Sequence, residues 1–187
     1  IGTTINLSEG SNNFGGAVSI TGADVTLVDA GAIILGTSTV TGTYAVTATA
    51  GGGITDSGVL DIRGASTFTA ANGQSIILDS ANIFRNPSVT FTGAGGSLSN
   101  VTINDSGGNT TTGAFELAAL TLATGGNLDV TAGGAVTNSG TLVIPGTTTI
   151  SAAGQDVTLN SANNNFTGAV SIEGDDVGVT DTNGIIL

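Results

Sequence analysis

The hydrophobic pattern of this 187-residue chain consists of short alternating segments. Apolar and polar residues alternate over three to five positions, as in Val25–Val28, Ile76–Leu78 and Leu142–Ile144, and Gly, Asn, Asp or Ser interrupts nearly every gap. Residues two positions apart lie on the same face of a β-strand. The pattern therefore predicts short strands joined by tight turns, with almost no helix.

The alternating segments follow one another at a spacing of roughly seven to ten residues. They are Ala17–Ile20, Val25–Val28, Ala32–Leu35, Ala45–Ala48, Val59–Ile62, Thr67–Thr69, Ile76–Leu78, Val89–Phe91, Val101–Ile103, Phe115–Leu117, Leu120–Leu122, Leu128–Val130, Leu142–Ile144 and Val157–Leu159. This spacing fits a sandwich or a barrel as well as a solenoid.

Internal repeats favour the solenoid. Leu7–Leu35 aligns without a gap with Leu159–Leu187, and 16 of the 29 positions are identical. A second pair of similar segments, Gly53–Gly64 and Ala135–Gly146, also aligns without a gap. A closed barrel has no reason to repeat its sequence, whereas a solenoid is a stack of similar units.

A third partial copy lies between these pairs. Ser75–Phe84 matches Asp156–Phe166 if one residue is inserted, so that Phe14, Phe84 and Phe166 mark equivalent points. The two intervals between these markers differ by about one short strand and turn. Two asparagines precede the marker in the outer copies, in the ranges 12–13 and 164–165. Asn12, Asn13, Asn164 and Asn165 are either inward corner amides that bind backbone groups or exposed turn residues.

We therefore predict an all-β fold, a parallel β-helix (β-solenoid) over residues 1–187, as a single segment of degenerate repeats of about 70–82 residues. Each coil would take about 20–25 residues over two or three strands, and coils would stack about 4.8 Å apart. The last copy breaks off at Leu187 in mid-repeat, so we expect the segment to be a fragment of a longer array.

The composition excludes several partners. The chain has no Cys, His, Lys, Met or Trp, its net charge is −12, and Arg63 and Arg85 are its only basic residues. Two arginines cannot make the basic footprint that nucleic acid requires, and no apolar run is long enough to insert into a membrane. Asp61 and Asp79 are candidate ion-pair partners for the arginines.

Three segments of the repeats resemble a known class of proteins. NNFGGAVSITGADVTL, GAIILGTSTVTGTYAVTATAGGGITDSGVL and TTTISAAGQDVTLNSANNNFTGAVSI resemble the tandem repeats of very large bacterial surface exoproteins similar to filamentous haemagglutinin, the secreted partners of two-partner secretion systems. The resemblance covers nearly the whole chain. It implies a right-handed β-helix, an extracellular or cell-surface location, and a role as an adhesin or biofilm scaffold.

An enzymatic function is not expected. Glycan-cleaving β-helices need clustered carboxylates, and the densest acidic group here is Asp175, Asp176 and Asp181. Asp24 matches Asp176 and Asp29 matches Asp181 in the aligned copies, so these acids recur as turn residues do. An enzyme needs one site, and the chain contains no histidine to act as a base.

Ligand binding leaves two alternatives. Asp175, Asp176 and Asp181 are the one candidate calcium site, although neither a calcium-binding nonapeptide repeat nor an EF-hand loop is present, and we predict no cofactor. The threonines of 37–43 and 147–149 are either a hydroxyl surface for ice or carbohydrate, or ordinary outward strand residues.

Two functions remain. In the first, the segment is a non-catalytic stalk of a bacterial surface adhesin or biofilm scaffold, and the host-cell or surface ligand binds elsewhere in the full protein. In the second, it is a self-assembling extracellular fibre or matrix protein in which strands at the coil ends pair between chains.

Overall fold

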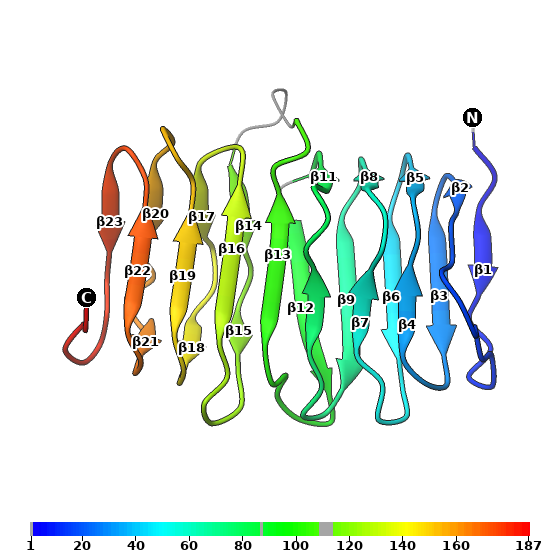
Figure 1. Ribbon diagram of the computed structural model, residues 1–187, viewed down its shortest axis with the longest axis horizontal. Helices are drawn as coiled ribbons and strands as arrows, with labels where there is room; N and C mark the ends of the chain where they lie inside the picture. Colours follow the sequence, from blue (N-terminus) through cyan, green and yellow to red (C-terminus); the bar gives the residue numbers. More distant parts are fainter. Residues whose placement is uncertain (1, 87, 109–113) are drawn as a thin grey trace.

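The computed structural model describes residues 2–86, 88–108 and 114–187, and all regular elements of these residues are β-strands. All pairing between the named strands is parallel, and the chain winds into an elongated β-solenoid of about eight turns with its termini at opposite ends (Figure 1). The predicted fold class is confirmed. The described residues contain no helix that could cross a membrane.

Two broad sheets and two narrow edge sheets make up the solenoid. The nine-stranded sheet contains β1 (Ile5–Leu7), β3 (Val25–Asp29), β6 (Tyr44–Ala48), β9 (Ser66–Ala71), β12 (Ser88–Ala94), β14 (Phe115–Leu117), β17 (Val136–Asn138), β20 (Val157–Leu159) and β23 (Val177–Val179). The seven-stranded sheet contains β4 (Ile33–Leu35), β7 (Ile54–Asp56), β10 (Ile76–Leu78), β13 (Val101–Asp105), β16 (Leu128–Ala132), β19 (Thr148–Ser151) and β22 (Val170–Glu173).

The edge sheets lie along opposite edges of the solenoid in Figure 1. The upper-edge sheet contains β2 (Thr21–Gly22), β5 (Ser38–Val40), β8 (Leu60–Ile62) and β11 (Ile83–Phe84). The lower-edge sheet contains β15 (Leu120–Thr121), β18 (Leu142–Ile144) and β21 (Asn165–Phe166).

The strand register gives the length of each coil, because paired residues lie one coil apart. In the nine-stranded sheet the shortest coil runs from Val25 to its partner Tyr44, and the longest runs from Val89 to Leu117. The other coils of this sheet fall between these two lengths and close to the shorter one. The predicted coil of about 20–25 residues therefore holds for most of the solenoid.

The predicted strand at Ala17–Ile20 is wrong. Within it only Val18 pairs, through an isolated bridge to Leu35, whereas the equivalent Val170–Glu173 is a full strand. The later segment pairs with β19 on one side and, through the bridge between Ala169 and Ile186, with the next coil on the other. The earlier segment precedes β4, which is the first strand of the seven-stranded sheet, so no strand supports it from the other side.

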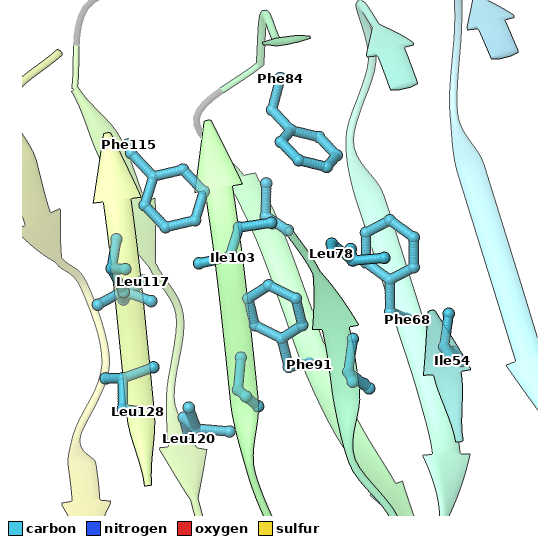
Figure 2. Close-up of a cluster of buried hydrophobic side chains, with 14 of the residues drawn as sticks. Ile54, Phe68, Leu78, Phe84, Phe91, Ile103, Phe115, Leu117, Leu120 and Leu128 are labelled. Carbon is cyan, nitrogen blue, oxygen red and sulfur yellow. The ribbon is translucent and has the colours of Figure 1, made fainter. Parts of the chain in front are cut away.

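Inward side chains form one continuous apolar core. Aliphatic residues on successive strands stack in register, and aromatic residues fill the middle of the rod (Figure 2). The fully buried ring of Phe68 meets Tyr44 and Phe84 edge-on, at 6.0 and 6.1 Å between ring centroids, and stacks on Phe91 at 6.0 Å. Such burial is the main favourable term for a chain without disulfides.

The repeats change sides of the solenoid along the chain. Gly53–Gly64 forms β7 and β8 and so turns from the seven-stranded sheet into the upper edge. Its relative Ala135–Gly146 forms β17 and β18 and turns from the nine-stranded sheet into the lower edge. The same sequence motif thus builds a corner on opposite edges of the rod.

The coil count explains this alternation. Leu7 and Leu159 are equivalent residues of the first and third copies, so two repeats separate them. They end β1 and β20 of the nine-stranded sheet, and seven coils lie between these strands. One repeat therefore corresponds to three and a half coils and ends half a turn away from where it began.

Candidate functional site

The polar residues that recur with the repeat lie at the corners of the coils, and Asn164 is typical. Its side chain is fully buried between β20 and β21. Its Oδ1 accepts the backbone N–H of Leu142 at 2.9 Å and the Nδ2 of Asn138 at 3.0 Å, and its own Nδ2 donates to the carbonyl of Leu159 at 3.2 Å. The amide ties two coils together and satisfies the Leu142 N–H, which the corner leaves without a ladder partner.

Asn82 makes the same contacts on the opposite edge. It too is fully buried, and its Oδ1 accepts the N–H of Leu60 at 2.9 Å while its Nδ2 donates to the carbonyl of Leu78 at 3.3 Å. Its Nδ2 also donates to Asp56, which is equivalent to Asn138, at 2.8 Å. We call each such stack of corner amides and carboxylates a corner ladder.

The inward interpretation of the asparagines is confirmed for the first of each pair. Asn12 donates from Nδ2 to the carbonyl of Leu7 at 3.0 Å, as Asn164 does to Leu159. The second of each pair behaves differently. Asn13 is exposed, and the Oδ1 of Asn165 accepts a surface bond from Asn183 at 3.1 Å.

A second recurring contact joins an aspartate to each marker phenylalanine. Three aspartates at equal intervals along the chain, Asp29, Asp105 and Asp181, each accept the marker's backbone N–H from the preceding coil. The pairs are Phe14 with Asp29 at 2.7 Å, Phe84 with Asp105 at 2.8 Å, and Phe166 with Asp181 at 3.1 Å. The carboxylates therefore hold successive coils in register.

Asp105 is the residue that the sequence analysis missed. The aligned copies match Asp29 with Asp181, but the middle copy diverges too far for a simple alignment to include Asp105. Its position midway between Asp29 and Asp181 was the available signal. Burial raises the pKa of the Asp105 carboxyl to about 7, against the opposing effect of the Phe84 N–H.

The pKa values of two other corner carboxylates, Asp56 and Asp24, are shifted in opposite directions. Burial raises the pKa of Asp56, although bonds from Asn82 and Ser80 oppose the shift. The pKa of Asp24 is lowered because the N–H and hydroxyl of Thr43 donate to it at 2.9 and 3.0 Å. These groups, too, are bound within the solenoid.

The candidate calcium ligands are not gathered around one point. Asp175 and Asp176 lie in the turn before β23, where their N–H groups donate to Gln155 and Asp156, whereas Asp181 follows β23 and binds Phe166. No group of three or more metal-ligating side chains occurs in the described part of the chain. The geometry gives the calcium prediction no support.

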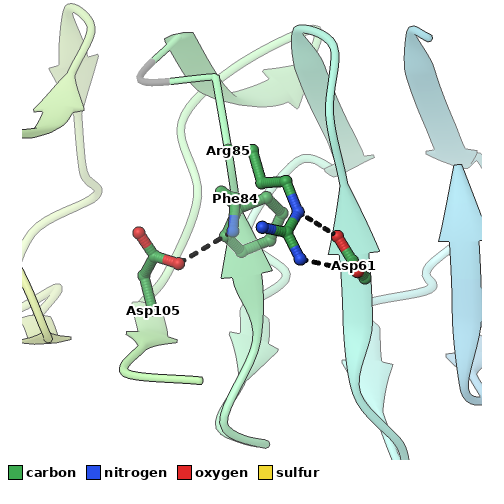
Figure 3. Close-up of polar contacts among 4 residues, drawn as sticks. All are labelled: Asp61, Phe84, Arg85 and Asp105. Carbon is green, nitrogen blue, oxygen red and sulfur yellow. Dashed lines mark hydrogen bonds and ion pairs between the residues drawn. The ribbon is translucent and has the colours of Figure 1, made fainter. Parts of the chain in front are cut away.

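The predicted ion pair of Arg85 is confirmed. Its Nε and Nη2 donate to the two carboxylate oxygens of Asp61 in the preceding coil, at 2.7 and 2.9 Å (Figure 3). The pair lowers the pKa of Asp61 and raises that of Arg85. Asp79 is no ion-pair partner in the described structure, where its N–H caps Asp56 instead.

The outer surface offers an open polar trough on the seven-stranded sheet, with a volume of about 340 Å³. It is lined by Ile77, Asn100, Thr102, Asn127, Leu128, Asp129, Thr147 and Thr149. Asn127 is already bound within the sheet, where its Oδ1 accepts the N–H of Thr147 at 2.8 Å. Asp129 is the only ionisable group in this lining, which gives the trough no pair of catalytic groups.

Threonines also line up on the outside of the nine-stranded sheet. Thr67 and Thr69 on β9 pair with Thr90 and Thr92 on β12. Ala45 on β6 interrupts the row at Thr67, whereas the row of Thr69 continues to Thr47 and ends at Val28 on β3. The threonines that line up between β9 and β12 therefore belong to neither of the two runs, 37–43 and 147–149, that the sequence analysis named as a possible hydroxyl surface.

The fold and the corner ladders define a repeat protein of the β-solenoid class. The chain belongs to a family described as repeats of unknown function (DUF5649), which matches it over residues 22–92 and 98–173. No curated protein and no solved structure matches it. The starts of the two matches, Gly22 and Leu98, lie as far apart in sequence as successive marker aspartates. Gly22 lies on the upper edge, and Leu98 lies beside Leu122, just beyond the lower-edge strand β15. One family repeat thus spans three and a half coils.

Proposed function

We propose that this segment is a non-catalytic structural stalk of an extracellular bacterial surface protein, an adhesin or biofilm scaffold of the filamentous haemagglutinin-like type. The observation that supports it is the use of the recurring polar residues. Asn82, Asn164, Asp29, Asp105 and Asp181 all bind backbone groups of the solenoid itself. Residues kept for a ligand would face outward, and these residues hold coils together.

The rod shape supports the same proposal. Each coil contacts only its neighbours, so the length grows with the number of repeats while the cross-section stays constant. At about 4.8 Å per coil, one repeat of three and a half coils adds about 17 Å. The net charge of −12 opposes contact between neighbouring rods. A rod of this kind would hold a binding region of the full protein at a distance from the cell surface.

Antibodies raised against the purified segment test the proposal on intact bacteria that produce the full protein. We expect labelling without permeabilisation, and we expect the purified segment, added in excess, to leave adhesion of the bacteria unchanged. Labelling only after permeabilisation would contradict the extracellular stalk. Competition with adhesion would show that the segment itself binds the ligand.

The alternative is a self-assembling extracellular fibre. It would require strand edges left unpaired at the ends of the full protein, of the kind that β1 and β23 present among the described residues, where Val177 is exposed. Strand addition at such edges would join rods end to end. Electron microscopy over a range of concentrations separates the two: short rods favour the stalk, and filaments that Val177→Pro shortens favour the fibre, because the Val177 N–H faces away from β20 and proline removes it.

A further inference from the structure

The marker aspartates differ in the number of backbone N–H groups that donate hydrogen bonds to their carboxyl groups. Asp29 is fully buried, and both of its oxygens are bound, Oδ2 by the N–H of Phe14 at 2.7 Å and Oδ1 by the N–H of Gly31 at 2.6 Å. Two backbone donors suit an ionised carboxylate, since each stabilises the negative charge.

Asp105 lacks such a second donor in the described part of the chain. It is 4% exposed, and among the described residues its carboxyl accepts only the N–H of Phe84. Gly107 follows Asp105 as Gly31 follows Asp29, but its N–H donates to the carbonyl of Asn82 instead, at 2.9 Å. The carboxyl of Asp105 is therefore nearly as enclosed as that of Asp29, but among the described residues it accepts one N–H where Asp29 accepts two.

No cation reaches Asp105 from the elements around it in the described structure. Arg85, which follows β11, directs its guanidinium to Asp61, as Figure 3 shows. Asp79, which follows β10, is an acid, and β16 places Ala132 beside Asp105. Asp56 lies further along the same edge, beyond Asn82, and is an acid too.

We propose that Asp105 and the N–H of Phe84 form a proton-dependent clasp between β11 and β13. With a neutral carboxyl the clasp is closed, because the enclosed group carries no charge and still accepts the N–H. When the carboxyl ionises, a single neutral donor among the described residues faces a buried anion, and the corner opens to let water reach it.

The direction of the pH dependence follows from the raised pKa of Asp105, about 7 against about 3.9 for a free aspartate. Between these values the closed form holds a proton that the open form has lost. Closing is therefore favoured at acidic pH, weakens as the pH rises from about 4 to about 7, and is constant above that. From pH 5 to pH 7 the opening equilibrium should increase on the order of 50-fold.

Amide hydrogen exchange of the full chain tests the clasp at the Phe84 N–H. We expect its protection factor, which already corrects for the intrinsic pH dependence of exchange, to fall on the order of 50-fold from pH 5 to pH 7. In Asp105→Asn, whose amide oxygen accepts the same N–H without titrating, the factor should change little. In Asp129→Asn, which alters an exposed acid on β16, the full fall should remain.

Two results would overturn the clasp. One is an unchanged protection factor in the native chain, and the other is the same fall in Asp105→Asn. Carboxyl ¹³C NMR of the native chain avoids dependence on the variant's folding: a titration midpoint of Asp105 near 7 supports the clasp, and one below about 5 refutes it.

Discussion

Replacing Asn164 by alanine should destabilise the solenoid strongly, although the side chain touches no ligand. The change removes the acceptor of the Leu142 N–H and leaves that donor buried without a partner. It also removes the bonds to Asn138 and Leu159, both of which keep another partner, Gly140 for the Asn138 amide and an N–H for the Leu159 carbonyl. One stranded donor costs about 1–3 kcal/mol and each of the two other lost bonds about 1 kcal/mol, so we expect a loss of about 3–5 kcal/mol.

Urea unfolding followed by far-ultraviolet circular dichroism measures this loss. The matched control is Asn165→Ala, the next residue, whose Oδ1 makes surface bonds to Thr167 and Asn183 and whose removal should cost less than about 1 kcal/mol. Asn82→Ala should reproduce the Asn164 result because it occupies the same place on the opposite edge. Equal losses for Asn164→Ala and Asn165→Ala would refute the role assigned to the corner ladder.

Three further outcomes can be measured on the same chain. Phe68→Ala should lower the free energy of unfolding by about 3–5 kcal/mol, since it empties the aromatic centre of the core; a loss below about 1 kcal/mol would contradict that packing. Arg85→Ala should cost only about 0–1 kcal/mol in dilute buffer and less in about 1 M salt, because the pair with Asp61 is partly exposed; a larger, salt-independent loss would show a buried role. Gold labels on Thr67→Cys and Thr149→Cys should lie on opposite faces of the rod in electron micrographs, and labels on one face would disprove the half-turn between repeats.

Some features of the fold could be predicted from the sequence because they depend on neighbouring residues. Val25–Val28 and Leu142–Ile144 alternate with period two, so they form strands with one buried face wherever they lie. Short strands such as β11 and β21 were not predicted, because two residues carry no periodic signal and only a neighbouring coil makes them strands. The segment Ala17–Ile20 shows the converse, since it alternates well but in the described structure has a neighbouring coil on one side only.

The candidate sites divide in the same way. The repeat positions of Asn12, Asn164, Asp29 and Asp181 could be read from the aligned copies, but the orientation of the amides could not, because the sequence allowed both inward and exposed asparagines. That Asp29 binds Phe14 could not, because the two residues are well separated along the chain and the winding alone brings them together.

The sequence by itself determined that this is a repetitive all-β chain with apolar and polar faces, and it set the equal spacing of the marker aspartates. Only the tertiary structure decided on which edge each repeat lies. The reason is geometric: a repeat of three and a half coils is not a whole number of turns, and the length of a coil is fixed by how strands pack around the shared core. The same winding decided that, among the described residues, Asp105 is enclosed with one donor while Asp29 has two, because Gly107 found a different acceptor in the coil beside it.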